Sequence, residues 1–329
     1  MEIKVISEIA SAHEGDTVKL RELIFSAVSS DADFIKLQIF NFNELVASDN
    51  KVFSILKKVE LGSFEWISVL DYAYSIGAKI IAEVYDDKSF NLVKGHKSIK
   101  GYKIPTSDIN NFDLISVISN ENLPVFIGTG GATQLEIDKA FNIFKDREPP
   151  ILIHGIQSFP TKVSDSYLEK ISLLRNRYKC EVGYADHVDA EDKYLAFIIP
   201  AMAFSRGARY IEKHITLSRE NKGLDYYSAL NPGEFINFVK IMKQISGSFS
   251  DTNSIEFLGK AEIEYREKMK KYAVAKDQIK KGDPLTSECV VFKRTNEPGL
   301  SNFEFFNFIN KEFNQDVNKN EVISFKHFS

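Results

Sequence analysis

The sequence has few cysteines and no long apolar run. Its two cysteines, Cys180 and Cys289, lie far apart and form neither a CxxC pair nor the Cys/His spacing of a zinc site. A disulfide framework and a structural zinc are therefore not predicted, and we expect two buried thiols in a reducing cytoplasm. No apolar run approaches the roughly 18 residues of a membrane span. Residues 1–5 already follow a strand pattern and contain neither a basic region nor the apolar core of a signal peptide. We therefore expect a cytoplasmic protein without membrane association.

An excess of charge of one sign is also missing. Lysine and arginine number 42 and aspartate and glutamate 46, which gives a formal net charge of -4. This balance gives no electrostatic reason to expect nucleic acid or an anionic membrane as a partner, although it allows a local basic pocket for a small anion. Apolar residues make up 43% of the 329-residue chain, so the chain can bury a sizeable core.

Eight short apolar runs alternate with segments of helical spacing. The runs cover residues 4–10, 34–40, 79–85, 101–107, 124–130, 150–156, 180–186 and 209–215. The helical segments cover residues 18–28, 64–74, 135–144, 167–174, 194–204 and 233–245, with shorter ones at 88–95 and after 110. Runs that are apolar on both faces indicate parallel strands. Eight repeats without a glycine-rich dinucleotide fingerprint predict an α/β fold, a (β/α)8 TIM barrel, rather than an open sheet.

The composition and periodicity of the sequence change after the eighth repeat. A polar stretch at 246–254 indicates a linker, a charged helix is predicted at 260–271, and a β-rich tail follows. We therefore predict a barrel domain over residues 1–247, a linker and connecting helix over 248–271, and a small β-rich domain over 272–329. This tail is small for a core of its own, so we expect it to dock on the barrel or on a partner subunit.

Polar side chains gather at the carboxyl ends of the eight apolar runs. TIM-barrel enzymes carry their active sites at this end of the strands. The residues are Glu8, His13, Lys36, Gln38, Glu83, Lys103, Thr106, Asp108, His154, Gln157, Asp186, His187, Glu212, Lys213 and His214.

Two of these residues, His187 and His214, occupy equivalent places at the ends of consecutive runs. Imidazole is a common ligand for divalent transition metals. Histidines at the ends of adjacent strands would both point into the same end of the barrel. A metal with open positions would act there as a Lewis acid on a carbonyl. The alternative is that each histidine is buried and hydrogen-bonded to a neighbouring carboxylate, Asp186 or Glu212.

Lys36 and Lys103 each interrupt an apolar run. An unpaired ammonium inside a barrel would cost several kcal/mol, so both lysines need an anion. Residues 128–131 (GTGG) offer backbone N–H groups at a predicted helix start. The pattern therefore predicts a phosphate or carboxylate of a substrate, and the alternative is a pair of structural salt bridges to Glu8 or Glu83.

Nine segments together resemble one known family over nearly the whole chain. They are SEIASAHEGD, DFIKLQIF, GYKIPTSDI, PVFIGTGGAT, ILIHGIQSFPT, VGYADH, IEKHIT, LDYYSALNPGEF and, in the tail, IKKGDPLTSECVVFKR. The sequence resembles the sialic acid synthase family, which condenses phosphoenolpyruvate with an aldehyde sugar to nine-carbon 2-keto-3-deoxy acids. The tail is similar to the antifreeze-like (SAF) domain that follows the barrel in this family.

The resemblance implies a metal site and an anion site. His187 and His214 match the family's ligands of a divalent metal, usually Mn2+, with Mg2+ or Co2+ as alternatives. Lys36 and Lys103 match its phosphoenolpyruvate-binding lysines. The implied activity is that of a transferase that makes a sialic-acid-like (nonulosonic) acid.

The resemblance also implies roles for five further residues. Glu8 matches the acid that handles the water or proton of the condensation, and Gln38 sits where the family has a site glutamine. Asp225 matches an aspartate that contacts the sugar, and Asp108 replaces a glutamate that does so. Arg294 matches an arginine that the tail of one subunit inserts into the site of the other, which implies a domain-swapped homodimer.

The sequence departs from the family at the phosphoenolpyruvate contacts. Where the family has serine hydroxyls, Thr106 keeps the hydroxyl but Gly128 and Ala185 lose it, and Gln157 replaces an asparagine. Each lost hydrogen bond to a charged group costs about 1.5–3 kcal/mol unless the backbone, Thr129 or water replaces it. The sequence is thus a divergent branch, whose sugar we expect to differ from the family's usual ones.

The residues are also consistent with two other functions. The lost serines favour an aldolase, lyase or epimerase that acts on a sugar phosphate in the same barrel. A non-catalytic carbohydrate-binding protein is the third reading, and it is disfavoured because a chain under no catalytic demand has little reason to bury so many charges.

Overall fold

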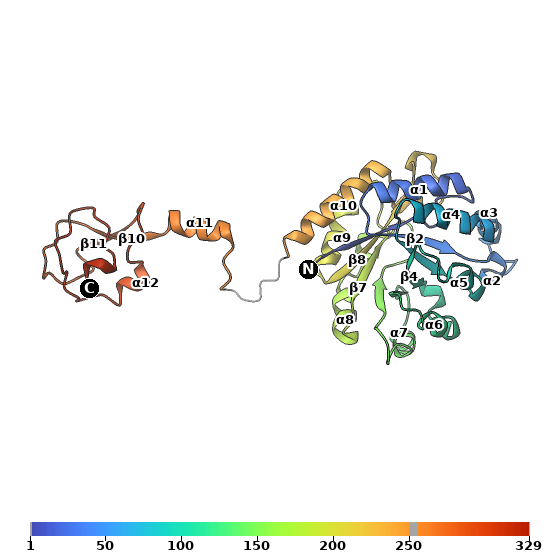
Figure 1. The fold of residues 1–329 in the computed structure, drawn as a ribbon, viewed down its shortest axis with the longest axis horizontal. Helices are drawn as coiled ribbons and strands as arrows, with labels where there is room; N and C mark the ends of the chain where they lie inside the picture. Colours follow the sequence, from blue (N-terminus) through green and yellow to red (C-terminus); the bar gives the residue numbers. More distant parts are fainter. Residues whose placement is uncertain (1, 250–255, 329) are drawn as a thin grey trace. The chain divides into compact units, whose positions relative to one another are not determined.

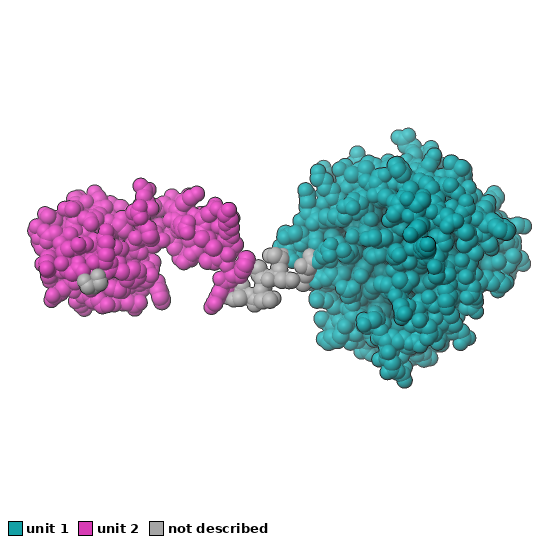
Figure 2. All heavy atoms as spheres, viewed as in Figure 1, with its two compact units in different colours: residues 1–250 teal, residues 251–329 magenta. Residues whose placement is uncertain are grey.

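The computed structural model describes residues 2–249 and 256–328, so the predicted linker lies outside the described residues at positions 250–254. The chain divides into two compact units, residues 1–250 and 251–329, which are coloured teal and magenta in Figure 2. Each unit is built around its own apolar cluster.

The first unit is a closed barrel of eight parallel strands (Figure 1). The strands are β1 (Lys4–Glu8), β2 (Phe34–Ile39), β3 (Ile80–Val84), β4 (Ile99–Ile104), β5 (Val125–Gly128), β6 (Ile151–His154), β7 (Val182–Asp186) and β8 (Ala208–Ile215). Each strand pairs with the next one, and β8 pairs with β1 to close the ring. All eight predicted strands are present, and the predicted TIM barrel is confirmed.

Helices connect the strands and cover the outside of the barrel (Figure 1). They are α1 (Thr17–Ser29), α2 (Phe42–Leu45), α3 (Phe53–Val59), α4 (Ser63–Ser75), α5 (Asp87–Val93), α6 (Phe112–Ile118), α7 (Gln134–Asn142), α8 (Glu169–Tyr178), α9 (Leu195–Ser205) and α10 (Pro232–Gly247). Most begin at a recognisable cap; at α1, for example, the Asp16 carboxylate accepts from the backbone N–H groups of Val18 and Lys19. Within residues 2–249 and 256–328, no helix combines the length and apolarity needed to cross a bilayer.

The inside of the barrel is layered, because inward-facing residues recur at every second position of a strand. The lower layer is apolar and contains Ile6, Phe34, Ile81, Phe126, Ile151 and Tyr210. Two positions further along, the strands carry Glu8, Lys36, Glu83, Gly128, Ile153 and Glu212, and β4 carries Lys103. The apolar core therefore ends where the charged layer begins, at the carboxyl ends of the strands.

A short ninth strand follows the barrel. β9 (Ala229–Leu230) pairs in parallel with the end of β8, and Ala229 lies opposite His214. A 3-10 turn at Tyr226–Ser228 leads into it. The sequence analysis did not predict β9, which holds only two residues.

The second unit has a core of its own. It contains α11 (Lys260–Met269), α12 (Asn302–Phe305) and an antiparallel pair, β10 (Lys271–Ala275) and β11 (Val290–Arg294). Its buried side chains are Ala273, Ala275, Ile279, Leu285, Val290, Leu300, Phe305, Phe313, Val317 and Ile323. This tail, expected to be small for a core of its own, thus has an apolar core, and its docking on the barrel or on a partner subunit stays a prediction.

Candidate active site

A cavity of about 330 Å3 opens at the carboxyl ends of the barrel strands. Ten predicted site residues line it, namely Glu8, Lys36, Gln38, Lys103, Thr106, Gly128, Gln157, His187, His214 and Asp225. The fold thus brings together residues that are up to 217 positions apart in the sequence. A second cavity, of about 690 Å3, lies where β5 and β6 begin, but its Arg147 is hydrogen-bonded to Ser119 and Asn120. We therefore place the chemistry in the smaller cavity, where the charged residues converge.

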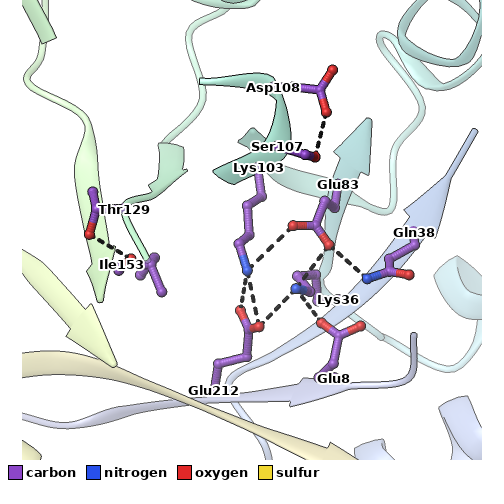
Figure 3. Close-up of polar contacts among 10 residues, drawn as sticks. All are labelled: Glu8, Lys36, Gln38, Glu83, Lys103, Ser107, Asp108, Thr129, Ile153 and Glu212. Atoms are coloured by element: carbon purple, nitrogen blue, oxygen red, sulfur yellow. Dashed lines mark hydrogen bonds and ion pairs between the residues drawn. The ribbon is translucent and has the colours of Figure 1, made fainter. Parts of the chain in front are cut away.

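Two lysines and three glutamates form one ion-pair cluster on the cavity floor (Figure 3). The Lys36 ammonium lies 2.5 Å from Glu8 Oε2, 3.0 Å from Glu83 Oε2 and 2.8 Å from Glu212 Oε1. Lys103 Nζ lies 2.9 Å from Glu212 Oε2 and 3.4 Å from Glu83 Oε1. All five side chains are at least 95% buried. The salt bridges that were the alternative to an anion site are thus present in this structure.

Mutual attraction opposes the cost of burial in this cluster, but burial prevails at Lys36, whose pKa is lowered. Burial alone raises the pKa of the Glu212 carboxyl, but the ammonium groups of Lys103 and Lys36 outweigh it and hold that pKa well below its usual range. The pKa of Glu83 is lowered in the same way against its own burial. Burial lowers the pKa of Lys103, but Glu212 and Glu83 reverse this, so the pKa is raised and the lysine stays charged.

Glu83, Glu212 and Tyr85 also line the cavity but were not assigned to the site from the sequence. Glu83 and Glu212 were recognised only as strand-end acids, and Tyr85 was not singled out. Glu83 accepts a hydrogen bond from Gln38 Nε2 at 3.1 Å, which orients the predicted glutamine. The signal for the two glutamates was their position, since each lies two residues beyond an inward-facing side chain, at Ile81 and Tyr210.

His187 and His214 lie side by side, with ring centroids 5.2 Å apart. The edge of the Phe159 ring packs against both imidazoles, at 4.7 and 5.8 Å. Burial lowers the pKa of His187 to about 3 and holds the pKa of His214 well below its usual value. Both rings are therefore neutral near pH 7, the protonation state in which imidazole binds metals.

The two histidines fit a divalent metal that takes its remaining ligands from elsewhere. Nδ1 of His187 is buried and has no hydrogen-bond partner among the described residues, and a buried nitrogen without a partner requires a water or a metal. Within residues 2–249 and 256–328, no group of three or more His, Cys, Asp or Glu side chains is arranged to hold a metal. A metal at this place would thus keep open positions for water and substrate oxygens, as catalytic metals do.

Thr106 and Gly128 pack against each other at the edge of the cavity. A Cβ atom at position 128 would lie 2.6 Å from Thr106 Oγ1 and 2.9 Å from the Thr106 backbone nitrogen. Residue 128 therefore has no room for a side chain, and the hydroxyl of Thr106 occupies the space that a serine at 128 would need.

Three predicted site residues lie away from the cavity lining. The hydroxyl of Thr129 donates to the Ile153 carbonyl oxygen at 3.1 Å, and its backbone N–H donates to the same oxygen (Figure 3). Both donors of Thr129 are thus engaged by the Ile153 carbonyl, and its contact with a substrate stays a prediction. Asp108 lies in a 3-10 turn beyond Thr106, where Ser107 donates to it at 2.7 Å. Arg294 is exposed at the end of β11 in the second unit, so its role stays a prediction.

Asp225 and Gln157 lie on the loops that rim the cavity. Asp225 adopts a left-handed backbone conformation with φ of 62°, and its Oδ2 accepts from the Ser11 backbone N–H at 3.2 Å. Burial raises the pKa of its carboxyl. Gln157 is exposed beyond β6. Both polar side chains line the cavity.

Comparisons with known proteins relate the chain to one family. The sequence profile of the NeuB family matches residues 23–254. An N,N'-diacetyllegionaminic acid synthase of Campylobacter jejuni is 26% identical, covering 97% of this chain and 98% of the relative. A pseudaminic acid synthase of the same species is 27% identical over 87% of this chain and 85% of its own length. A solved N-acetylneuraminic acid (sialic acid) synthetase from Leptospira borgpetersenii, in complex with citrate, is 28% identical, covers 82% of this chain and 93% of that chain, and has a TM-score of 0.73.

Proposed function

This chain belongs to the NeuB family, and we propose that it condenses phosphoenolpyruvate with an aldehyde sugar, of the N-acyl mannosamine kind, to a 2-keto-3-deoxy nonulosonic acid. The names of the relatives, synthases of legionaminic, pseudaminic and sialic acids, support a product of this class. The observation that carries the proposal is that two buried lysines and two adjacent imidazoles share one cavity of about 330 Å3.

Lys36 and Lys103 supply the positive charge for the donor. Phosphoenolpyruvate is a polyanion, and the two ammonium groups would balance its carboxylate and phosphate charges. In the ligand-free cavity both lysines are held by Glu8, Glu83 and Glu212, so the incoming anion must displace carboxylate oxygens. Thr106 also lines the cavity, and its hydroxyl can add a donor.

His187 and His214 would hold the divalent metal, Mn2+ with Mg2+ or Co2+ as alternatives, which when bound polarises the aldehyde oxygen of the sugar. The rings stand at the rim of the cavity beside Phe159. Asp225, Gln157 and, beyond the lining, Asp108 would bind the sugar hydroxyls.

The reaction forms one carbon–carbon bond and breaks one phosphate ester. C3 of phosphoenolpyruvate attacks the aldehyde carbon, whose oxygen takes up a proton and becomes a hydroxyl. Water adds at C2, and the tetrahedral intermediate expels inorganic phosphate to leave the 2-keto acid. Glu8 lines the cavity and can take the proton of the attacking water, while Lys36 beside it stabilises the developing charge.

The proposal is tested by measuring phosphate release from phosphoenolpyruvate with a panel of N-acyl hexosamines and Mn2+. We expect release with at least one sugar, loss of activity on chelation with EDTA, and loss in His187→Ala. His96→Ala is the matched control, since this histidine does not line the cavity and its ring is hydrogen-bonded to Asp71 and Ser98, so the variant should keep full activity.

Absence of phosphate release across a broad panel of aldoses would refute the proposal. Calorimetry then identifies the other enzyme class: tight binding of a sugar phosphate without binding of phosphoenolpyruvate indicates an aldolase, lyase or epimerase on this barrel.

A further inference from the structure

A strap formed by residues 225–230 contacts two loops and one strand at the carboxyl end of the barrel. At its start, the carboxylate of Asp225 accepts from the Ser11 backbone in the loop after β1. In its middle, the Tyr227 carbonyl accepts from the Ala190 backbone N–H at 2.8 Å, in the loop after β7. At its end, β9 runs alongside β8. The strap therefore joins the loops after β1 and β7 to the end of β8.

The carbonyl of His187 is held by two donors. The Ser228 hydroxyl donates to it at 2.6 Å, and the Thr161 backbone N–H donates to it at 2.7 Å. Ser228 is fully buried. A carbonyl oxygen has two lone pairs, and both are used here. The backbone of His187, and with it the origin of its side chain, is thus fixed from two directions.

The residue after Ser228 fixes the other histidine. Ala229 lies opposite His214 in the parallel pairing of β9 with β8. One dipeptide of the strap therefore touches both imidazole-bearing residues, through a side chain at His187 and through the backbone at His214. Without the Ser228 hydroxyl, the strap would still pair with β8 but would lose its direct bond to His187.

We propose that Ser228 is a positioning residue that sets the separation of His187 and His214 and thereby the affinity of the site for its divalent metal. This inference rests on the proposed metal role of the two histidines. Two-ligand sites depend strongly on the placement of each ligand, since no third side chain corrects an error. Loss of a hydrogen bond that orients a ligand typically weakens metal affinity about 10-fold to 100-fold.

The test is the dissociation constant for Mn2+ of the full-length protein, measured by the electron paramagnetic resonance signal of free Mn2+. We expect Ser228→Ala to raise this constant about 10-fold or more. Ser30→Ala is the matched control, because the Ser30 hydroxyl is also buried and also donates to a carbonyl at 2.6 Å, that of Ala27 at the end of α1. This control should lose similar thermal stability and keep the wild-type affinity.

The outcomes separate the two proposals. If the wild-type protein binds Mn2+ and His187→Ala does not, but Ser228→Ala binds as tightly as wild type, the role of Ser228 is refuted and the metal site stands. If wild type and His187→Ala bind Mn2+ equally, or neither binds it, the metal site and the role of Ser228 both fall. If Ser228→Ala does not fold, the Mn2+ dissociation constant of Ser228→Cys is measured instead. Its thiol is a weak donor of similar size, so an intermediate loss of Mn2+ affinity is expected.

Discussion

Lys36 has no spare donor in the ligand-free cavity. A lysine ammonium carries three N–H groups, and that of Lys36 contacts Glu8, Glu83 and Glu212. Three carboxylates against two lysines leave the cluster with one excess negative charge when all are ionised. The carboxylates therefore offset part of the cost of burying the two lysines, and they also compete with the substrate anion for the same donors.

The structural and catalytic roles of Lys103 can be separated by a double substitution. Lys103→Met leaves Glu212 and Glu83 with one cation between them, and breaking a buried ion pair in this way should cost about 3–5 kcal/mol of stability. Adding Glu212→Gln removes the surplus charge and should restore most of the lost melting temperature. Phosphate release should stay at least about 100-fold below wild type in both variants, because the donor for the substrate anion is absent. A double variant with wild-type activity would make Lys103 a structural residue only.

The sequence identified the members of the site better than their contacts. The sequence pointed to Lys36, Lys103, His187 and His214, because a polar residue within or at the end of an apolar run is costly to bury without a partner. The absence of a side chain at Gly128 could be read only as a lost hydroxyl, since its cause is a close approach of Thr106 from the 3-10 turn that follows β4. Such contacts depend on how that turn lies against the end of β5, and the sequence of neither segment contains that information.

At the scale of elements, helix α7 begins later than a phosphate-binding loop would require. The GTGG segment at 128–131 was expected to offer N–H groups at a helix start, but α7 begins at Gln134. Its first turn is closed by a capping box, in which Thr133 Oγ1 accepts from the Glu136 backbone and the Glu136 carboxylate accepts from the Thr133 N–H at 2.7 Å. An acid thus occupies the place where an anion would bind.

Thr133→Ala tests whether this helix start takes part in substrate binding. Removal of an N-cap hydroxyl should lower stability by about 1 kcal/mol, measured as a shift in melting temperature. The KM for phosphoenolpyruvate should be unchanged, because the cap faces Glu136 and not the cavity. A several-fold change in KM with kcat unaltered would instead place the α7 N-terminus in the anion site.

The ends of helices and strands were easier to explain from the sequence where a residue that terminates an element, such as proline, was present. The fourth strand was predicted to reach position 107 and ends at Ile104, because Pro105 has no N–H to donate and a 3-10 turn follows. The eight strands themselves were predictable because buried parallel strands are apolar on both faces. β9 was not, because two residues carry no periodicity.

At the scale of the whole molecule, the two units differ in what their own residues provide. The barrel contains the lysines, the histidines and the strap, whereas the second unit provides one candidate, Arg294, on the exposed end of β11. The resemblance assigns this arginine to the cavity of a partner subunit. A site assembled from two chains cannot be derived from the hydrophobic pattern of one chain, so this assignment needs an experiment on mixed subunits.

Complementation between two inactive variants tests the domain-swapped homodimer. His187→Ala removes a metal ligand from the barrel, and Arg294→Ala removes the arginine that would be supplied in trans, so each variant alone should be inactive. In a mixed dimer, the barrel of the Arg294→Ala chain keeps both histidines and receives an intact arginine from its partner, which makes one of its two sites complete. Random mixing makes half of the dimers mixed, and co-expression should therefore restore about a quarter of wild-type phosphate release. Light scattering should give twice the mass of one chain. If each subunit used its own arginine, every site in the mixture would keep one lesion, and co-expression would restore no activity.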